Sequence, residues 1–166
     1  MMNKNTKKLM FTAVALLVLV AAVYFIFPKN GEENGAGKSK EIKTVKDADI
    51  VIPISSVTEE VAFYPAEMNG TKLEVIAVKA SDGTVRTAFN TCQVCYGSGR
   101  GYYEQEGEEL ICQNCGNRFA MDDVEVSRGG CNPVPITEDY KSIEGDNIII
   151  SKDFLTQATV IFQNWK

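Results

Sequence analysis

Five cysteines, in a chain of 166 residues that has no histidine, form the pattern with the most chemical content. Cys92 and Cys95 make one C-x₂-C pair, and Cys112 and Cys115 make a second. Sixteen residues separate the two pairs, and Cys131 follows after a further 15. The spacing lets both thiolates of one tight turn face the same ion or cluster. The sequence therefore predicts a metal site on the two pairs.

Three kinds of occupant are compatible with this site. One is a structural zinc ion held by four thiolates. Another is iron, as a single ion or as an iron–sulfur cluster on four thiolates. The third is a set of disulfide bonds, which an extracytoplasmic location permits. An odd number of cysteines disfavours a purely disulfide scheme. Cys131 itself is either a further thiolate beside the metal or a small buried apolar residue.

The absence of histidine excludes several classes of active site. A Ser-His-Asp triad, a histidine-ligated zinc enzyme, a CxxCH haem attachment and a histidine-ligated Rieske cluster are all impossible. No other group is poised for acid–base or nucleophilic catalysis. We therefore expect an accessory protein that transfers electrons or binds metal, rather than an enzyme.

Residues 48–166 must position the cysteines, and their sequence is typical of a mainly β domain. Residues 72–80 have apolar side chains on both faces, as a central strand requires. Asn-Gly, Asp-Gly and Glu-Gly dipeptides between the apolar runs supply the positive φ of tight hairpins. No long stretch beyond the N-terminal segment described below has helical periodicity. We expect strands at residues 51–54, 72–80, 84–89, 109–112, 147–151 and 158–162.

The segment between the two cysteine pairs, residues 96–111, predicts a hairpin that returns the second pair to the first. Four aromatic residues flank the cysteines and are expected to shield the site from water: Tyr96, Tyr102, Tyr103 and Phe119.

Residues 9–27 form an uncharged, apolar run of 19 residues. At about 1.5 Å per residue the run spans roughly 29 Å, close to the ~30 Å hydrocarbon core of a bilayer. Lysines precede it, so the positive-inside rule places the basic tail, residues 1–8, in the cytoplasm and the rest of the chain outside. The alternative is a cleavable signal peptide, whose apolar region is usually about 7–15 residues and ends at a small-x-small site. This run is longer and ends in bulky residues, which favours an uncleaved signal-anchor, a single transmembrane helix.

Residues 28–47 are rich in Gly, Lys, Glu and Asn and predict a flexible tether. The whole chain has a net charge of −5, but residues 48–166 hold nine basic and 18 acidic residues, a net charge of −9. An acidic domain disfavours nucleic-acid binding, which requires the neutralisation of phosphates. Nucleic acid is therefore not an expected partner.

The arrangement of residues 48–151 resembles a Rieske domain. A strand, an Asp-Gly hairpin, a second strand and a first ligand loop are followed by a second ligand loop, an Arg-Phe pair and a Gly- and Pro-rich loop. The resemblance implies a small antiparallel sheet domain with two Cys-bearing hairpin loops. It departs at the ligands, because Cys95 and Cys115 stand where a Rieske domain uses histidine. An all-thiolate centre should have a lower reduction potential than a histidine-ligated one.

A more specific resemblance is to the FtrD-like membrane iron–sulfur proteins, which are predicted to accompany bacterial iron permeases. The shared motifs are the paired C-x₂-C around Gly101-Tyr102-Tyr103, the run of residues 111–119, and Gly-Gly-Cys-Asn-Pro-Val-Pro at residues 129–135. All five cysteines fall on cysteine positions of that family. The resemblance favours iron, chiefly as an iron–sulfur cluster, and leaves zinc as the alternative. Some members have further membrane spans, so this chain, with one, lacks a transport pathway of its own.

These observations combine into one expectation, a membrane-anchored, extracytoplasmic metal-binding protein. Its site would hold an iron–sulfur cluster on Cys92, Cys95, Cys112 and Cys115, with Cys131 nearby, and would transfer single electrons in support of iron transport. The expected partners are the membrane and an iron permease or redox protein. The alternative is a zinc-stabilised binding module with four cysteine ligands and no redox activity.

Overall fold

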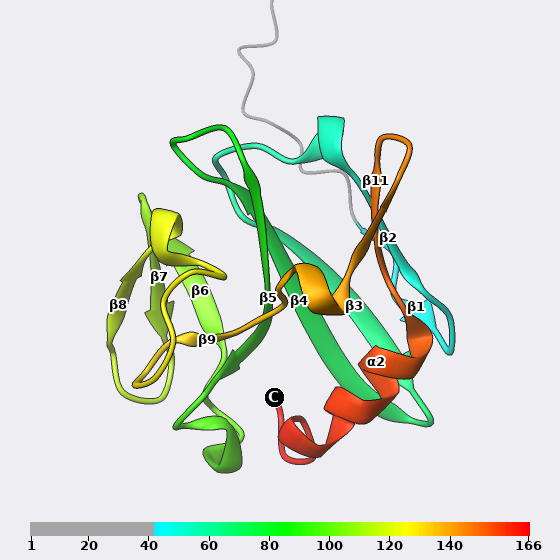
Figure 1. The fold of residues 1–166 in the computed structure, drawn as a ribbon. Coiled ribbons are helices and arrows are strands. Elements are labelled where there is room, and N and C mark those ends of the chain that lie inside the picture. Colours follow the sequence, from blue (N-terminus) through cyan, green and yellow to red (C-terminus); the bar gives the residue numbers. More distant parts are fainter. Residues whose placement is uncertain (1–41) are drawn as a thin grey trace, which may run out of the picture. The chain divides into compact units, whose positions relative to one another are not determined.

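The computed structural model describes residues 42–166 (Figure 1). The predicted cytoplasmic tail, membrane anchor and all but the last six residues of the predicted tether lie outside these residues. Among the helices of the described part, none is long and apolar enough to cross a membrane.

A five-stranded sheet forms the centre of the domain, in the order β1-β3-β4-β5-β9. Its pairs are antiparallel, except that β1 runs parallel to β3. The strand β4 occupies the middle of this sheet, as the two-sided apolar pattern predicts, and four consecutive residues from Val75 to Val78 are fully buried. The strands are β1 (Val45–Lys46), β3 (Ala62–Met68), β4 (Thr71–Lys79), β5 (Val85–Cys92) and β9 (Pro133–Pro135).

Two smaller antiparallel sheets of three strands accompany the central sheet. One has the order β10-β11-β2, and the other has the order β6-β7-β8. The first consists of β2 (Ile50–Pro53), β10 (Ser142–Glu144) and β11 (Asn147–Ile150); the second consists of β6 (Tyr103–Glu106), β7 (Glu109–Cys112) and β8 (Arg118–Ala120). In Figure 1 these two sheets lie on opposite sides of the central one. The mainly β prediction is therefore confirmed.

Successive residues of β4 pack into two different hydrophobic cores, because neighbouring side chains of a strand point to opposite faces. Val75 and Ala77 join a core that includes the β2 and β11 residues and Leu155. Ile76 and Val78 join a second core with side chains from the β6-β7-β8 sheet. The second core contains Cys92 and Cys112, so it forms the floor beneath the cysteines: Ile76, Val78, Ala88, Cys92, Tyr103, Leu110, Cys112, Phe119, Met121 and Val124.

The prediction of a strand at residues 158–162 is wrong, because these residues lie at the end of a short helical segment. Lys152–Ala158 form the helix α2, and Thr159–Ile161 continue it as the 3₁₀ turn η5. Ser151 caps α2, since its side chain accepts a hydrogen bond from the backbone of Phe154 at 3.3 Å. The cap and Asp153 in the first turn were the helix-start signal in the sequence. The apolar run belongs to the end of this short helical segment.

The sequence did not predict the strand β3, because Pro65 interrupts its pattern and proline is uncommon inside a strand. Its side chains nevertheless alternate in burial, with Tyr64, Ala66 and Met68 directed into the core. The turn to β4 is made by Asn69 and Gly70, both with positive φ.

Candidate metal centre

The five cysteines lie on three segments that the sheets bring together. Cys92 ends β5 and Cys95 lies in the turn that follows, while Cys112 ends β7 and Cys115 lies in the turn before β8. Only the second pair occupies a hairpin loop, because β5 and β6 belong to different sheets. The expected hairpin between the pairs is present as β6 and β7, in which Tyr103 faces Cys112.

Two backbone hydrogen bonds align the cysteine segments. Cys92 donates its N–H to the carbonyl of Gly101 at 2.7 Å, and Gln113 donates to the carbonyl of Tyr102 at 2.9 Å. Gly101 has no space for a side chain, since a Cβ there would lie 2.8 Å from the carbonyl group of Cys95. Gly101 therefore lets the chain close tightly on the first cysteine turn, while the carbonyl of Tyr102 binds the second turn.

The sulfur atoms converge around Cys131. Its Sγ lies 3.3 Å from that of Cys92, 3.6 Å from that of Cys95 and 2.8 Å from that of Cys115. Four sulfurs, those of Cys92, Cys95, Cys112 and Cys131, all lie within 4.8 Å of one another. The structure thus unites all five predicted residues, and Cys131 takes a central rather than a peripheral place.

Each C-x₂-C turn directs backbone N–H groups at its first sulfur. The N–H groups of Val94 and Cys95 lie 3.4 and 3.3 Å from the sulfur of Cys92. The sulfur of Cys112 accepts from the backbone of Cys115 and Asn114 in the same way. Gly116, at φ 72°, lets the second turn curl so that its N–H reaches the carbonyl of Cys112 at 2.8 Å. Such donors stabilise a thiolate, the form of cysteine that binds a metal.

The surroundings of the thiols shift their pKa values in opposite directions. At Cys92, burial opposes ionisation, but the hydrogen bonds of the Cys95 and Val94 N–H groups and of the Tyr103 and Cys131 side chains together outweigh it and leave the pKa below its ordinary value. The hydrogen bond from Cys131 is the main cause that lowers the pKa of the exposed Cys115 to about 7. Burial raises the pKa of Cys112 to about 11, and burial likewise raises that of Cys131. Cys115 is thus the readily ionised thiol at the solvent edge.

The loop that carries Cys131 is fixed from both sides. The carbonyl of Cys131 accepts hydrogen bonds from the Tyr103 hydroxyl at 2.8 Å and from the Asn117 side chain at 3.0 Å. Gln93 donates its N–H to the carbonyl of Asn132 at 2.9 Å. Both cysteine turns therefore hold the third segment between them. The sequence left the role of Cys131 open, and these contacts place it inside the site.

The chain was compared with known proteins. The model of one protein family, described as membrane iron-sulfur containing protein FtrD-like, matches residues 56–162. The chain belongs to the FtrD-like family. No curated protein and no solved structure matches it. The Rieske-like layout accordingly stays a prediction, while the family resemblance is confirmed.

The donor set of this FtrD-like chain fits the iron–sulfur assignment of its family. Cysteine thiolates are the usual ligands of iron–sulfur centres, and five of them meet here. Tyr103 and Phe119 are buried beneath the sulfurs and exclude water, as expected, whereas Tyr96 is 43% exposed. The shielding prediction therefore holds for the floor of the site and not for its outer edge.

Asn90 supports the FtrD-like site without contacting a sulfur. It is fully buried, accepts a hydrogen bond from the backbone of Tyr103 at 2.7 Å and donates to the side chain of Glu74 at 2.7 Å. Sequence reasoning missed this residue, because a single asparagine in a strand has no distinctive spacing. It joins β5 to β6 two residues before the first cysteine.

Residues 163–166 close over the first cysteine loop. Lys166 donates its N–H to the carbonyl of Gly99 at 3.1 Å, and the Trp165 indole donates to the carbonyl of Asn90 at 2.8 Å. A Cβ at Gly99 would collide with the carbonyl oxygen of Asn164. This contact joins segments more than 60 residues apart, and no sequence pattern signals it.

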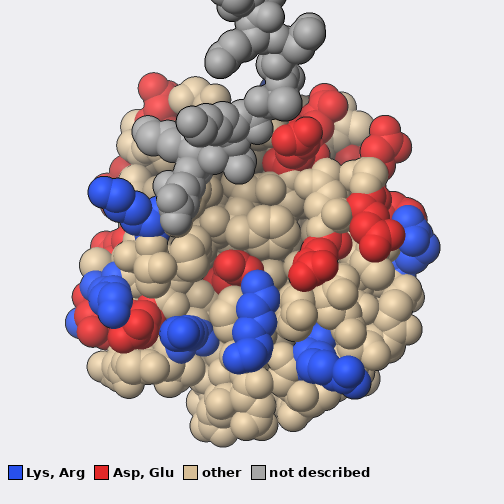
Figure 2. Space-filling view, turned by 180° about the vertical axis from the view of Figure 1, so that it is seen from behind, with Lys and Arg blue, Asp and Glu red and all other residues tan. Residues whose placement is uncertain are grey.

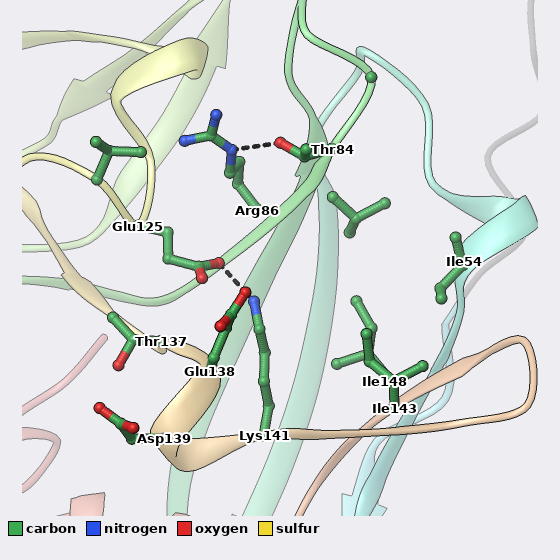
Figure 3. A pocket seen from close by; sticks show the side chains of 13 residues that line it. Ile54, Thr84, Arg86, Glu125, Thr137, Glu138, Asp139, Lys141, Ile143 and Ile148 are labelled. Carbon is green, nitrogen blue, oxygen red and sulfur yellow. Dashed lines mark hydrogen bonds and ion pairs between the residues drawn. The ribbon is translucent and has the colours of Figure 1, made fainter.

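A separate hollow of about 960 Å³ contains no cysteine. Figure 3 shows its floor, where Lys141 forms an ion pair with Glu125 at 2.6 Å. Glu125 also accepts a hydrogen bond from the backbone of Thr87 in β5 at 2.8 Å. Both charged side chains are almost fully buried. Glu125 therefore fastens the chain just before the Cys131 loop to the central sheet.

Proposed function

We propose that this FtrD-like protein is anchored in the membrane, holds an extracytoplasmic iron–sulfur centre on its cysteines, and transfers single electrons in support of iron transport. The convergence of five cysteine sulfurs in a chain of this family carries the proposal. The lysine-flanked apolar run at residues 9–27 supports the anchor and the orientation.

In this proposal, Cys92, Cys95, Cys112 and Cys115 are the expected ligands, and Cys131 is a fifth thiolate within reach. Their thiolates would bind the iron, which supplies the one-electron redox couple. The backbone N–H groups directed at Cys92 and Cys112 would stabilise the negative charge of the sulfurs. Tyr103 and Phe119 would keep water from the inner side of the centre.

The spacing of the sulfurs favours a second candidate, a single ion. Metal–sulfur bonds of about 2.3 Å in a tetrahedral site separate the sulfurs by roughly 3.8 Å. The sulfur of Cys131 lies at a similar distance from those of Cys92 and Cys95, and the compact group of four lies within 4.8 Å. A four-iron cluster binds each thiolate to a different iron and needs a wider ring. One iron or one zinc ion on four thiolates therefore fits this arrangement more closely than a four-iron cluster does.

Metal analysis of the full-length protein, purified without oxygen, tests these alternatives. Iron with an equal amount of acid-labile sulfide, a brown colour and an EPR signal on reduction is the result expected for a cluster. Iron without sulfide indicates a single ferric or ferrous ion, which retains the electron-transfer function. One zinc ion in a colourless protein overturns the electron-transfer proposal and supports a zinc-stabilised module. The matched control is Cys112→Ser, which should lose the metal in all three cases.

A further inference from the structure

The loops around the sulfurs differ in charge from the rest of the domain. We define the cysteine loops as residues 92–102, 112–118 and 127–133. None of the 18 acidic residues of the domain falls within them, whereas three arginines do. On the face drawn in Figure 2, acidic side chains lie over the upper and middle parts, and none lies at the lower end. An acidic domain thus carries a locally basic surface at its metal centre.

Two of the three arginines have no partner in the described part of the chain. Arg118 pairs with Glu109 at 2.6 Å, which offsets its charge. The guanidinium groups of Arg100 and Arg128 are exposed and, among residues 42–166, form no ion pair or hydrogen bond. Neither donates to a sulfur, so they do not act as direct counterions of the thiolates. Their charge is directed to solvent.

Apolar side chains are exposed on the same loops. Val94, between the two cysteines of the first pair, is 66% exposed, and Tyr96, directly after them, is 43% exposed. Cys115 is exposed at the edge of the site. Apolar side chains with a charged rim are typical of surfaces that bind another protein.

We propose that the cysteine loops form a docking surface for a protein partner whose contacting face is acidic with an apolar centre. Arg100 and Arg128 would face its acidic rim, and Val94 and Tyr96 would contact its apolar centre. The proposal rests on the proposed function, since one electron would pass between the docked partner and the metal centre. No bond forms or breaks in that step, and one centre loses the electron that the other gains.

The choice of an acidic partner follows from the separation of charge. Complementary potentials steer a partner towards the matching patch and raise the rate of productive encounter. A basic partner would be drawn to the acid-rich remainder of the domain, away from the sulfurs. An acidic partner is repelled by that remainder and attracted only at the cysteine loops, which orients it for electron transfer.

Two small oxidants of opposite charge probe this surface on the full-length, metal-loaded protein in non-ionic detergent. They are anionic hexacyanoferrate(III) and cationic tris(phenanthroline)cobalt(III), each used in stopped flow over a range of ionic strength. The rate with the anion should fall by about threefold or more between low salt and roughly 0.3 M, despite the negative charge of the protein. A poly-glutamate peptide should slow this reaction, and poly-lysine should not.

The double variant Arg100→Glu/Arg128→Glu should lose the salt dependence and the inhibition by poly-glutamate. The matched control is Lys43→Glu/Lys79→Glu, which changes the net charge equally at exposed lysines outside the cysteine loops. It should behave as the unaltered protein. An equal effect of the two double variants would overturn the proposal, as would a wild-type rate that falls with salt only for the cationic oxidant.

A protein that neither reagent oxidises would refute the proposed electron transfer but still permit a test of the surface. The thiols of the metal-free protein would then react with anionic dithiobis(nitrobenzoate) and with uncharged dithiodipyridine. A salt dependence confined to the anionic reagent, and lost in Arg100→Glu/Arg128→Glu, supports the basic surface. The absence of that dependence in the unaltered protein contradicts it.

Discussion

The sulfur of Cys131 lies 2.8 Å from that of Cys115, yet only Cys131 belongs to the compact group of four. Cys115 is the expected ligand from the C-x₂-C spacing, whereas Cys131 comes from a different segment. Four positions around a metal thus have five candidate thiolates. Either of these two neighbours can complete a set that Cys92, Cys95 and Cys112 begin.

Serine variants should reveal this redundancy. We expect Cys115→Ser and Cys131→Ser each to retain metal with weaker binding, because the neighbouring thiolate takes the vacant position. The double variant should lose the metal, as should Cys112→Ser alone, because the sulfurs of Cys115 and Cys131 lie 2.8 Å apart and together fill only one position. Metal content per protein and competition with a chelator measure the effect. Loss of metal from Cys131→Ser as complete as that from Cys112→Ser would show that Cys131 is irreplaceable.

The reactivity of the metal-free, reduced protein should depend on pH through Cys115. Alkylation requires the thiolate, so a pKa of about 7 predicts a rate that rises around pH 7 and levels above it. Cys112, with its pKa raised to about 11, should stay protonated and be alkylated slowly over that pH range. Cys131→Ala removes the hydrogen bond that most lowers the pKa of Cys115, so its profile should move to higher pH. Mass spectrometry of the labelled peptides identifies the reacting residue, and first labelling at Cys112 would contradict the prediction.

Gly99→Ala should destabilise the first cysteine loop strongly. The new Cβ would collide with the carbonyl of Asn164, and φ is +77°, a region that side chains disfavour. Gly83→Ala is the matched control, since its φ is +85° but the surrounding space is open. We expect a loss of about 1 kcal/mol for the control, from backbone strain alone, and a clearly larger loss for Gly99→Ala. Equal losses in denaturant unfolding would show that residues 163–166 do not hold the loop.

The buried ion pair of Glu125 and Lys141 should be costly to break from one side. Glu125→Ala leaves the Lys141 ammonium buried without its partner, for which about 3–5 kcal/mol is typical. Glu125→Ala/Lys141→Met removes both charges and should recover a large part of that stability. Urea unfolding of the two variants measures the difference. A double variant less stable than Glu125→Ala would show that the unpaired charge of Lys141 is not the cause of the destabilisation.

The sequence predicted the parts of the fold that depend on short-range patterns. The two-sided apolar run became the central β4, and the Glu-Gly turn joined β6 to β7. The C-x₂-C pairs named the site, because two thiolates on one turn must lie close together. Pro65 concealed the strand β3, for which there was no prediction, and the strand predicted at residues 158–162 is instead the end of the helical segment after Ser151.

Long-range contacts account for what the sequence could not predict. The central position of Cys131 depends on the hydroxyl of Tyr103 and on the pairing of β9 with β5. The packing of Trp165 beside Asn90 joins residues 75 positions apart. Such contacts arise from the folded arrangement as a whole and have no local spacing that would reveal them.

The strand β4 separates the two hydrophobic cores, and only one of these cores contains cysteines of the site. The face with Ile76 and Val78 lies against the core beneath the cysteines, which a bound metal would help to organise, and the face with Val75 and Ala77 lies against the core that includes α2 and β11 residues. Removal of the metal should therefore loosen the protein on one side only. In the metal-free protein, amide protons of β6, β7 and β8 would exchange rapidly, while those of β3 and β11 would keep their protection. The domain would therefore stay partly folded and able to bind the metal again.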